Sequence, residues 1–178
     1  MPTASKSPVS DKNLSAEAEK LAAFLRSRAP AEDLGEYEPV VLERSAALAY
    51  RALKKHKRGD SVIAIDSDPA LVRRGRPLTV ITVINDNMPF LFDSITGEIA
   101  DHAGEASLVL HPVVLVRHDK SGVAELIGES IPGKADADAD RVSLIQVHVG
   151  RLGEEAAAAL TERLAHVLSQ VRAAVGDW

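Results

Sequence analysis

The chain has 178 residues and is 46% hydrophobic, which is enough for one domain with a substantial core. Its formal net charge of −5 provides no positive field for nucleic acid or for an anionic membrane, so we expect neither as a partner. The absence of cysteine excludes disulfides, thiolate zinc sites and cysteine nucleophiles, and the absence of a signal peptide or a long apolar stretch predicts a cytoplasmic protein.

The N-terminal third is predicted to be helical. Residues 1–13 are polar and are expected to form a flexible tail. Apolar residues at helical spacing predict a helix over 14–28 and a second helix that starts near Glu36 or Pro39 and ends in the basic run RALKKHKR. Basic residues at a helix C-terminus interact favourably with the helix dipole, so this run is not evidence for nucleic-acid binding. Residues 14–58 therefore form a predicted helical pair.

From residue 61 onward the pattern becomes that of strands and helices in turn. Strands are predicted at 61–66, 78–84, 107–119 and 141–152, and helices at 89–104 and 154–175, the first of them with the apolar stripe Leu91, Ile95 and Ile99. From residue 78 the order is β, α, β, β, α, a ferredoxin-like arrangement without its last strand, and 61–66 can fill that place. The predicted fold of 61–178 is therefore α+β, a four-stranded antiparallel sheet with both helices on one face. A weak segment, VAELIGESIPG, leads into 132–141, where alternating Ala and Asp predict a mobile hairpin tip.

The register of the last two predicted strands assigns their side chains to faces. The predicted hairpin pairs Val114 with Ile145. The same register places His111 opposite His148, and because no third ligand is spaced suitably, a polar pair is preferred to a metal site. The face without helices carries the candidate interface residues Val109, His111, Val113, Leu115, Gln146 and His148. This face has to be covered by the N-terminal helices, by a second copy or by further domains.

Motifs for catalysis are absent from the sequence. Neither a dinucleotide-binding glycine pattern nor a phosphate loop occurs, and there is no nucleophile elbow. We therefore expect no catalytic residue, no metal and no cofactor in this segment.

Three segments carry a family resemblance: VINDNMPFLFDSITGEI, SLVLHPVVLVRHD and the closing helix through QVRAAVGDW. They resemble the N-terminal ACT-like domain of the large bacterial NAD-specific glutamate dehydrogenases, in which an NDDMPFLVDS-type segment follows a strand and a later strand carries HPV. The resemblance covers 61–178 and, more loosely, the two preceding helices. This chain departs from the family pattern at Asn87, Phe92, Gln146 and Gly150.

The resemblance implies a much longer parent chain that converts glutamate to 2-oxoglutarate and ammonia, with NAD bound far downstream. This segment would then be a non-catalytic regulatory or assembly domain, ACT-like in fold, with other domains of the same chain and further copies as partners. A free-standing amino-acid sensor and a purely structural oligomerisation module are the alternatives.

ACT domains often bind amino acids at the loop between their first strand and first helix. The resemblance therefore implies a ligand-binding segment comprising Asn85, Asp86, Asn87, Met88, Pro89, Asp93 and Ser94. Free N–H groups of the first helical turn can receive a carboxylate, and the side chains at 85–87 can meet an ammonium group. The same residues can instead cap the helix, with Pro89 in its first turn. The sequence leaves both interpretations open.

Overall fold

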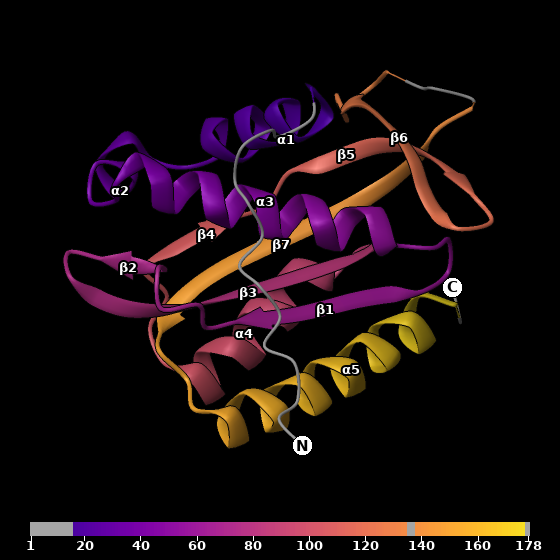
Figure 1. The fold of residues 1–178 in the computed structure, drawn as a ribbon. Coiled ribbons are helices and arrows are strands. Elements are labelled where there is room, and N and C mark those ends of the chain that lie inside the picture. Colours follow the sequence, from indigo (N-terminus) through magenta and orange to yellow (C-terminus); the bar gives the residue numbers. More distant parts are fainter. Residues whose placement is uncertain (1–15, 135–137, 177–178) are drawn as a thin grey trace, which may run out of the picture.

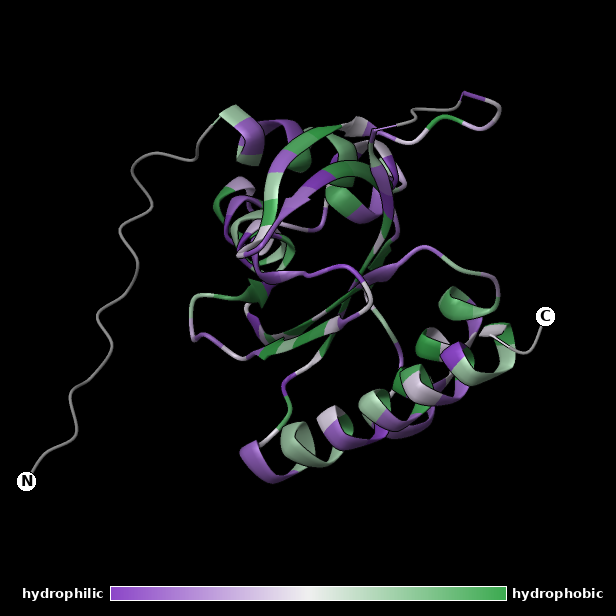
Figure 2. Ribbon diagram, turned by 90° about the vertical axis from the view of Figure 1, so that its right-hand side faces the viewer, coloured by the Kyte–Doolittle hydropathy of each residue, from purple (hydrophilic) through white to green (hydrophobic). Residues whose placement is uncertain are grey.

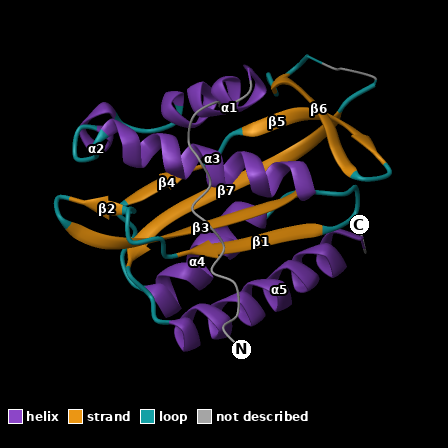
Figure 3. Cartoon of the chain, viewed as in Figure 1, coloured by secondary structure: helices purple, strands orange, loops and turns teal. Residues whose placement is uncertain are grey.

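The computed structural model describes residues 16–134 and 138–176. Its helices are α1 (Ala16–Ser27), α2 (Ala31–Leu34), α3 (Pro39–Lys55), α4 (Leu91–Ala103) and α5 (Glu154–Gly176). Its strands are β1 (Ser61–Asp66), β2 (Val72–Arg73), β3 (Arg76–Asp86), β4 (Leu108–Leu110), β5 (Val113–Asp119), β6 (Gly122–Glu129) and β7 (Asp140–Gly150). They form a mixed α+β fold with an antiparallel sheet between helices (Figure 1; Figure 3). The predicted tail at 1–13, and residues 135–137 of the predicted hairpin tip, lie outside the described residues.

The strand order of the main sheet is β1-β3-β7-β5-β6, with antiparallel neighbours throughout. Strand β1 pairs with β3, which is the place that the sequence indicated for 61–66. The short strands β2 and β4 pair with β3 and β7. Strands β3 and β7 are buried on both faces, so they form the centre of the sheet.

The sheet has more strands than the four predicted, for two reasons. The predicted strand 107–119 is interrupted at His111 and Pro112, because Pro112 has no N–H to donate to a strand ladder, and it becomes β4 and β5. The first seven residues of the weak segment VAELIGESIPG belong to β6, which pairs with β5. The pairing of β5 with β6 has register irregularities, which disturb the alternation that would identify a strand.

The register of the predicted hairpin is wrong by three residues. Val114 lies opposite Val142, three positions from its predicted partner. Because three is odd, the shift exchanges the two faces for every side chain of β4 and β5. The predicted facing of His111 and His148 is also wrong, since Leu108 lies opposite His148.

Apolar clusters lie on both faces of the sheet. One cluster, between the sheet and helices α4 and α5, includes Ile81, Val83, Ile95, Ile145 and Leu164. The other, between the sheet and helices α1 and α3, includes Leu21, Val41, Leu53, Val80 and Leu144. Figure 2 shows hydrophobic and hydrophilic positions mixed along α5, and its side chains Leu160, Leu164 and Leu168 are buried in the α4–α5 cluster. The expectation of an open sheet face is therefore wrong: the N-terminal helices, one of the three covers considered, lie on it. None of the helices in 16–134 and 138–176 combines the length and apolar character that a membrane crossing needs.

Gln146 and His148 lie under α3, fully buried, and so cannot belong to an open interface. Gln146 accepts a hydrogen bond from Ser45 Oγ (2.8 Å) and donates to the Ser45 carbonyl (2.8 Å). Since the one hydroxyl hydrogen of Ser45 is used, His148 Nε2 donates to Ser45 Oγ (2.9 Å) and His148 Nδ1 accepts from Tyr37 (3.1 Å). Burial lowers the pKa of His148 to about 4, and a neutral ring fits this pattern.

The two edges of the main sheet differ. At β6, Glu17 accepts the N–H of Leu126 (3.4 Å), while Lys20 and Lys54 donate to backbone carbonyls of the same strand (3.4 and 3.2 Å). Side chains of α1 and α3 thus occupy backbone groups of this edge strand. Strand β1 at the other edge pairs with β3 along one side. An edge strand with unpaired backbone groups can pair with a strand of another chain. The β6 edge is the protected one, because side chains occupy some of its backbone groups.

Candidate functional site

The predicted ligand-binding segment lies where β3 ends and the chain turns into α4. Strand β3 ends at Asp86, and the Asn87 N–H donates to the Arg141 carbonyl of β7 (3.0 Å). The helix begins two residues after Pro89, so the prediction that Pro89 lies in its first turn is wrong. Phe90 has a left-handed conformation (φ 65°) and is 66% exposed. A bulky residue rarely adopts this conformation, which costs about 1–3 kcal/mol.

Asn85, the first residue of the predicted polar cluster, is fully buried. Its Oδ1 accepts hydrogen bonds from Arg172 Nη2 (2.6 Å) and Ser61 Oγ (3.1 Å), and its Nδ2 donates to the Asp86 carbonyl (2.8 Å). Arg172 Nη2 also donates to Ser61 Oγ (2.6 Å). These bonds join β1, β3 and α5, so Asn85 holds the end of β3 in place.

Asp86 binds the connection between α3 and β1 instead of capping α4. Its Oδ2 accepts the Gly59 N–H (2.7 Å), and its Oδ1 lies 3.4 Å from His56 Nε2. Among the described residues, no side chain makes a capping hydrogen bond at the start of α4. The prediction of a helix cap at 85–87 is therefore wrong, because the helix begins at Leu91, too far along the chain for these side chains.

His56 and His118 form a buried pair of imidazole rings beside Asp86. Their side chains are 0% and 5% exposed, and His56 Nδ1 lies 2.9 Å from His118 Nε2. The Asp60 carbonyl can only accept, so His56 Nε2 carries the hydrogen of that contact (3.1 Å). Burial lowers the pKa of His56 and outweighs the opposing effect of Asp86. In a neutral His56 ring, Nδ1 accepts from His118.

The hydrogen-bonded chain continues from His118 to Asp140 and Arg58. His118 Nδ1 lies 2.8 Å from Asp140 Oδ2, and since a carboxylate only accepts, Nδ1 donates in this contact. Arg58 donates to the same oxygen from Nε (3.0 Å) and Nη2 (2.6 Å). Burial raises the pKa of Asp140, but the hydrogen bonds from Arg58 and His118 outweigh it and hold the pKa below its usual value. No group of three or more His, Cys, Asp or Glu side chains in 16–134 and 138–176 is arranged to hold a metal ion.

The HPV segment and the NDNMPFLFDS segment meet at Ser143 of β7. The His111 ring stacks on Phe92 of α4, with centroids 4.6 Å apart and planes 7° from parallel. His111 Nε2 and Ser143 Oγ share a hydrogen bond of 2.7 Å. Ser143 itself lies opposite Asn85 on one side and opposite Val113 on the other. Segments far apart in the sequence thus form one continuous region.

The other predicted ligand-binding residues differ in exposure. Asn87, Pro89 and Asp93 are exposed, whereas Met88 and Ser94 are partly buried, and Met88 packs against the α4–α5 cluster. Within the described residues, the side chains of Asn87 and Asp93 have no hydrogen-bond partner. They are therefore free to contact a ligand, whereas Asn85 and Asp86 already have internal partners.

Sequence reasoning missed the residues that hold this region together, which are His56, His118, Ser143 and Arg172. Their partners lie far along the chain: 62 positions separate the two histidines, 32 separate His111 from Ser143, and 87 separate Arg172 from Asn85. Local periodicity has no signal for such pairs. A correct prediction of the pairing between β3 and β7 would have identified Ser143, because this residue lies opposite Asn85.

The antiparallel sheet and the helices around it are consistent with an ACT-like domain. The family description "Glutamate dehydrogenase, ACT1 domain" matches residues 21–164, from α1 into α5. The chain belongs to this family. Comparison with curated proteins and with solved structures gave no match. Membership of the family implies a parent glutamate dehydrogenase and suggests that the domain is a regulatory module of it.

Proposed function

We propose that this chain is a non-catalytic regulatory and assembly domain of an NAD-dependent glutamate dehydrogenase. The observation that carries the proposal is the family match over residues 21–164, which includes both helical layers and the sheet. In this proposal the parent enzyme oxidatively deaminates L-glutamate to 2-oxoglutarate and ammonia, and NAD binds to its other domains. The domain itself supplies contacts and a response to an effector.

The proposed effector is an amino acid bound at the start of α4. Two features support this. The first turn of α4 has no side-chain cap, so its N–H groups are available to a carboxylate. Asn87 and Asp93 are exposed beside it and can receive an ammonium group. Met88, Pro89 and Ser94 complete the loop, while Asn85 and Asp86 support it from behind through Arg172 and Gly59.

The proposed assembly contact is also at this loop, and it involves other domains of the chain or further copies. Phe90 supports it, because an exposed aromatic side chain on a strained backbone costs free energy, and Phe90 belongs to neither apolar cluster of the described residues. Val109, Val113 and Leu115, partly buried on the α4 side of the sheet, remain candidates. His111 is occupied by Phe92 and Ser143.

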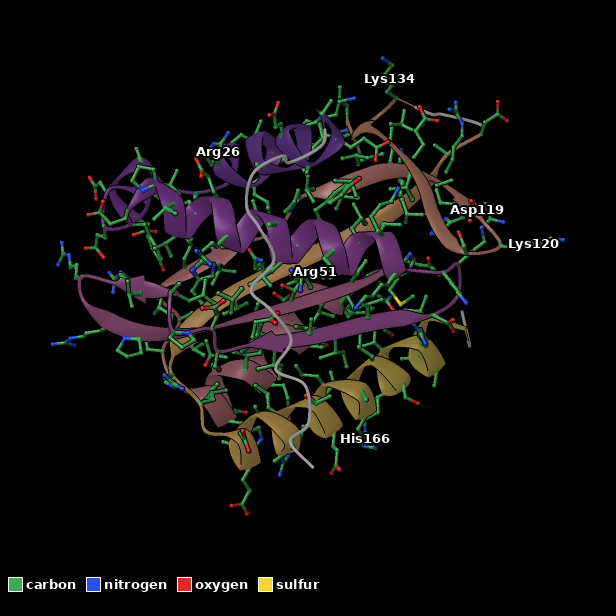
Figure 4. The ribbon with its side chains drawn as sticks, in the orientation of Figure 1. Arg26, Arg51, Asp119, Lys120, Lys134 and His166 are labelled. Atoms are coloured by element: carbon green, nitrogen blue, oxygen red, sulfur yellow. The ribbon has the colours of Figure 1, made fainter. Side chains whose placement is uncertain are left out.

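Kinetics of the full-length parent enzyme test this proposal. We expect glutamate-dependent NAD reduction by the parent, none by the 178-residue chain, and a change in rate when amino acids are titrated. The double variant Asn87→Ala, Asp93→Ala should lose that change. Arg26→Gln on α1, in the other helical layer (Figure 4), is the matched control and should retain it. An unaltered response in the double variant would contradict the proposed effector site.

One observation favours the alternative function, that of a purely structural module. Asn85 and Asp86, two of the polar residues of the loop, are occupied by internal hydrogen bonds. Calorimetric titration of the folded chain with amino acids separates the two functions: an effector site gives binding heat that the Asn87→Ala, Asp93→Ala variant loses, whereas a structural module gives no such difference.

A further inference from the structure

A groove of about 580 Å³ runs along β1, between the end of α3 and helix α5. Figure 1 shows β1 at the edge of the sheet between these helices. The residues that matter in its lining are Lys55, Lys57, Asp60, Val62, Leu168 and Arg172. The lining of the groove includes none of the loop residues 86–94, and the hydrogen bond from Arg172 to Asn85 connects it to the proposed effector site.

The groove is positively charged in a chain whose net charge is −5. Lys55, Lys57 and Arg172 line it together with one carboxylate, that of Asp60, which leaves an excess of two positive charges. Within the described residues, none of these three cations lies in an ion pair. Other arginines of the chain are paired, as in Arg58–Asp140, Arg117–Glu125 and Arg163–Glu98. The charge of Lys55 also interacts with the carboxylate of Asp66, which leaves Lys57 and Arg172 as the less neutralised cations of the groove. Cations that share a groove attract an anion.

Arg172 is held in a fixed position with hydrogen-bond donors to spare. Both hydrogens of its Nη2 are used, one by Ser61 Oγ and one by the buried Asn85 Oδ1, each at 2.6 Å. A guanidinium has five N–H donors, so those on Nε and Nη1 remain. Neither Ser61 nor Asn85 neutralises its charge. A preorganised guanidinium with free donors is well suited to a carboxylate.

We propose that this groove binds a small dicarboxylate. One carboxylate pairs with Arg172, and Lys55 and Lys57 receive the other, so the two negative charges match the excess positive charge of the lining. The apolar side chains of Val62 and Leu168 favour a carbon chain between the two ends over a compact inorganic anion. The binding does not depend on the identity of the parent enzyme.

Calorimetric titration of the folded chain with succinate, at low ionic strength, tests the proposal. We expect saturable binding with a Kd of about 1 mM or tighter, weakened by added KCl. Arg172→Gln should weaken binding by about tenfold or more, because a charge-assisted hydrogen bond is lost. Lys57→Gln, an exposed change that leaves the Asn85 contacts intact, should weaken it by about threefold or more.

The control is Arg163→Gln, on the same helix but outside the groove lining and paired with Glu98. It should leave the Kd of succinate unchanged. Absence of saturable binding, or equal affinities in the wild type and both groove variants, would overturn the proposal. Inorganic phosphate and acetate are titrated in parallel, and either one binding as tightly as succinate would overturn the assignment to a dicarboxylate. The succinate results do not depend on the proposed effector response: they would be the same if the parent dehydrogenase did not respond to amino acids.

Discussion

Nδ1 of His56 and Nε2 of His118 lie 2.9 Å apart in two rings that solvent scarcely reaches. One ring follows α3 and the other belongs to β5, so the pair joins the N-terminal helical layer to the sheet. Asp86 and Asp140 flank it on either side. The predicted effector loop therefore places one of its own carboxylates, that of Asp86, beside this hydrogen-bonded pair of rings.

His118→Leu should destabilise the chain by about 1–3 kcal/mol, because the buried His56 ring loses a hydrogen-bond partner and Asp140 keeps only Arg58. Urea unfolding followed by circular dichroism measures the change. Arg117→Gln is the neighbouring control: it breaks a pair with Glu125 in which both side chains are about half exposed, so it should cost less than about 1 kcal/mol. Equal losses in the two variants would contradict a structural role for the histidine pair.

Stability should fall as pH decreases below about 6.5. Burial lowers the pKa of His148 to about 4, and it also lowers the pKa of His56 and, together with Arg28, that of His111. Below pH 6.5 the unfolded chain therefore binds protons that the folded chain does not, which favours unfolding. For His148 alone the loss between pH 6.5 and 4 is about 3 kcal/mol.

Urea unfolding at several pH values checks this dependence. His148→Gln should be less stable at neutral pH but should lose less stability on acidification, since one titrating group is gone. His166→Gln on α5, exposed and pointing away from the sheet (Figure 4), should retain the wild-type slope. If His148→Gln also retained the full slope, His148 would not be the titrating group.

Asp86→Ala should cost about 1–2 kcal/mol, because the Gly59 N–H loses its acceptor and His56 loses a nearby carboxylate. Asp93→Ala removes an exposed carboxylate from the first turn of α4 and should cost less than about 1 kcal/mol. Chemical denaturation of the two variants in parallel compares them. A greater loss in Asp93→Ala would mean that the helix dipole contributes more than the contact between Asp86 and Gly59.

Phe90→Gly should leave the stability of the chain within about 1 kcal/mol of wild type, because glycine relieves the left-handed strain while increasing the entropy of the unfolded state. In the full-length parent, the same change should weaken assembly, as light scattering after gel filtration would show. Val40→Ser on α3 removes another exposed apolar side chain and should leave assembly intact. Unchanged assembly in Phe90→Gly would contradict an anchoring role.

The sequence indicated those parts of the fold whose pattern is local. Leu91, Ile95 and Ile99 repeat at helical spacing and are buried as predicted, and β3 follows from a run of β-branched residues. The pairing of β5 with β7 depends on where the connection between them turns back. An error of three residues in this register assigned the side chains of β4 and β5 to the wrong faces of the sheet. Contacts such as Arg172 with Asn85 depend on that three-dimensional placement, so no pattern along the chain could reveal them.

Because side chains occupy backbone groups of β6, the main sheet has only one edge, at β1, that can accept a further strand. Glu17, Lys20 and Lys54 occupy three backbone groups of that strand, so these groups are not available to pair with a strand of another chain. Any strand that extends this sheet has to arrive at β1. In two chains that pair through β1, the only remaining sheet edges would be the two β6 strands, which are protected. Assembly would therefore stop at a dimer instead of continuing into a fibre.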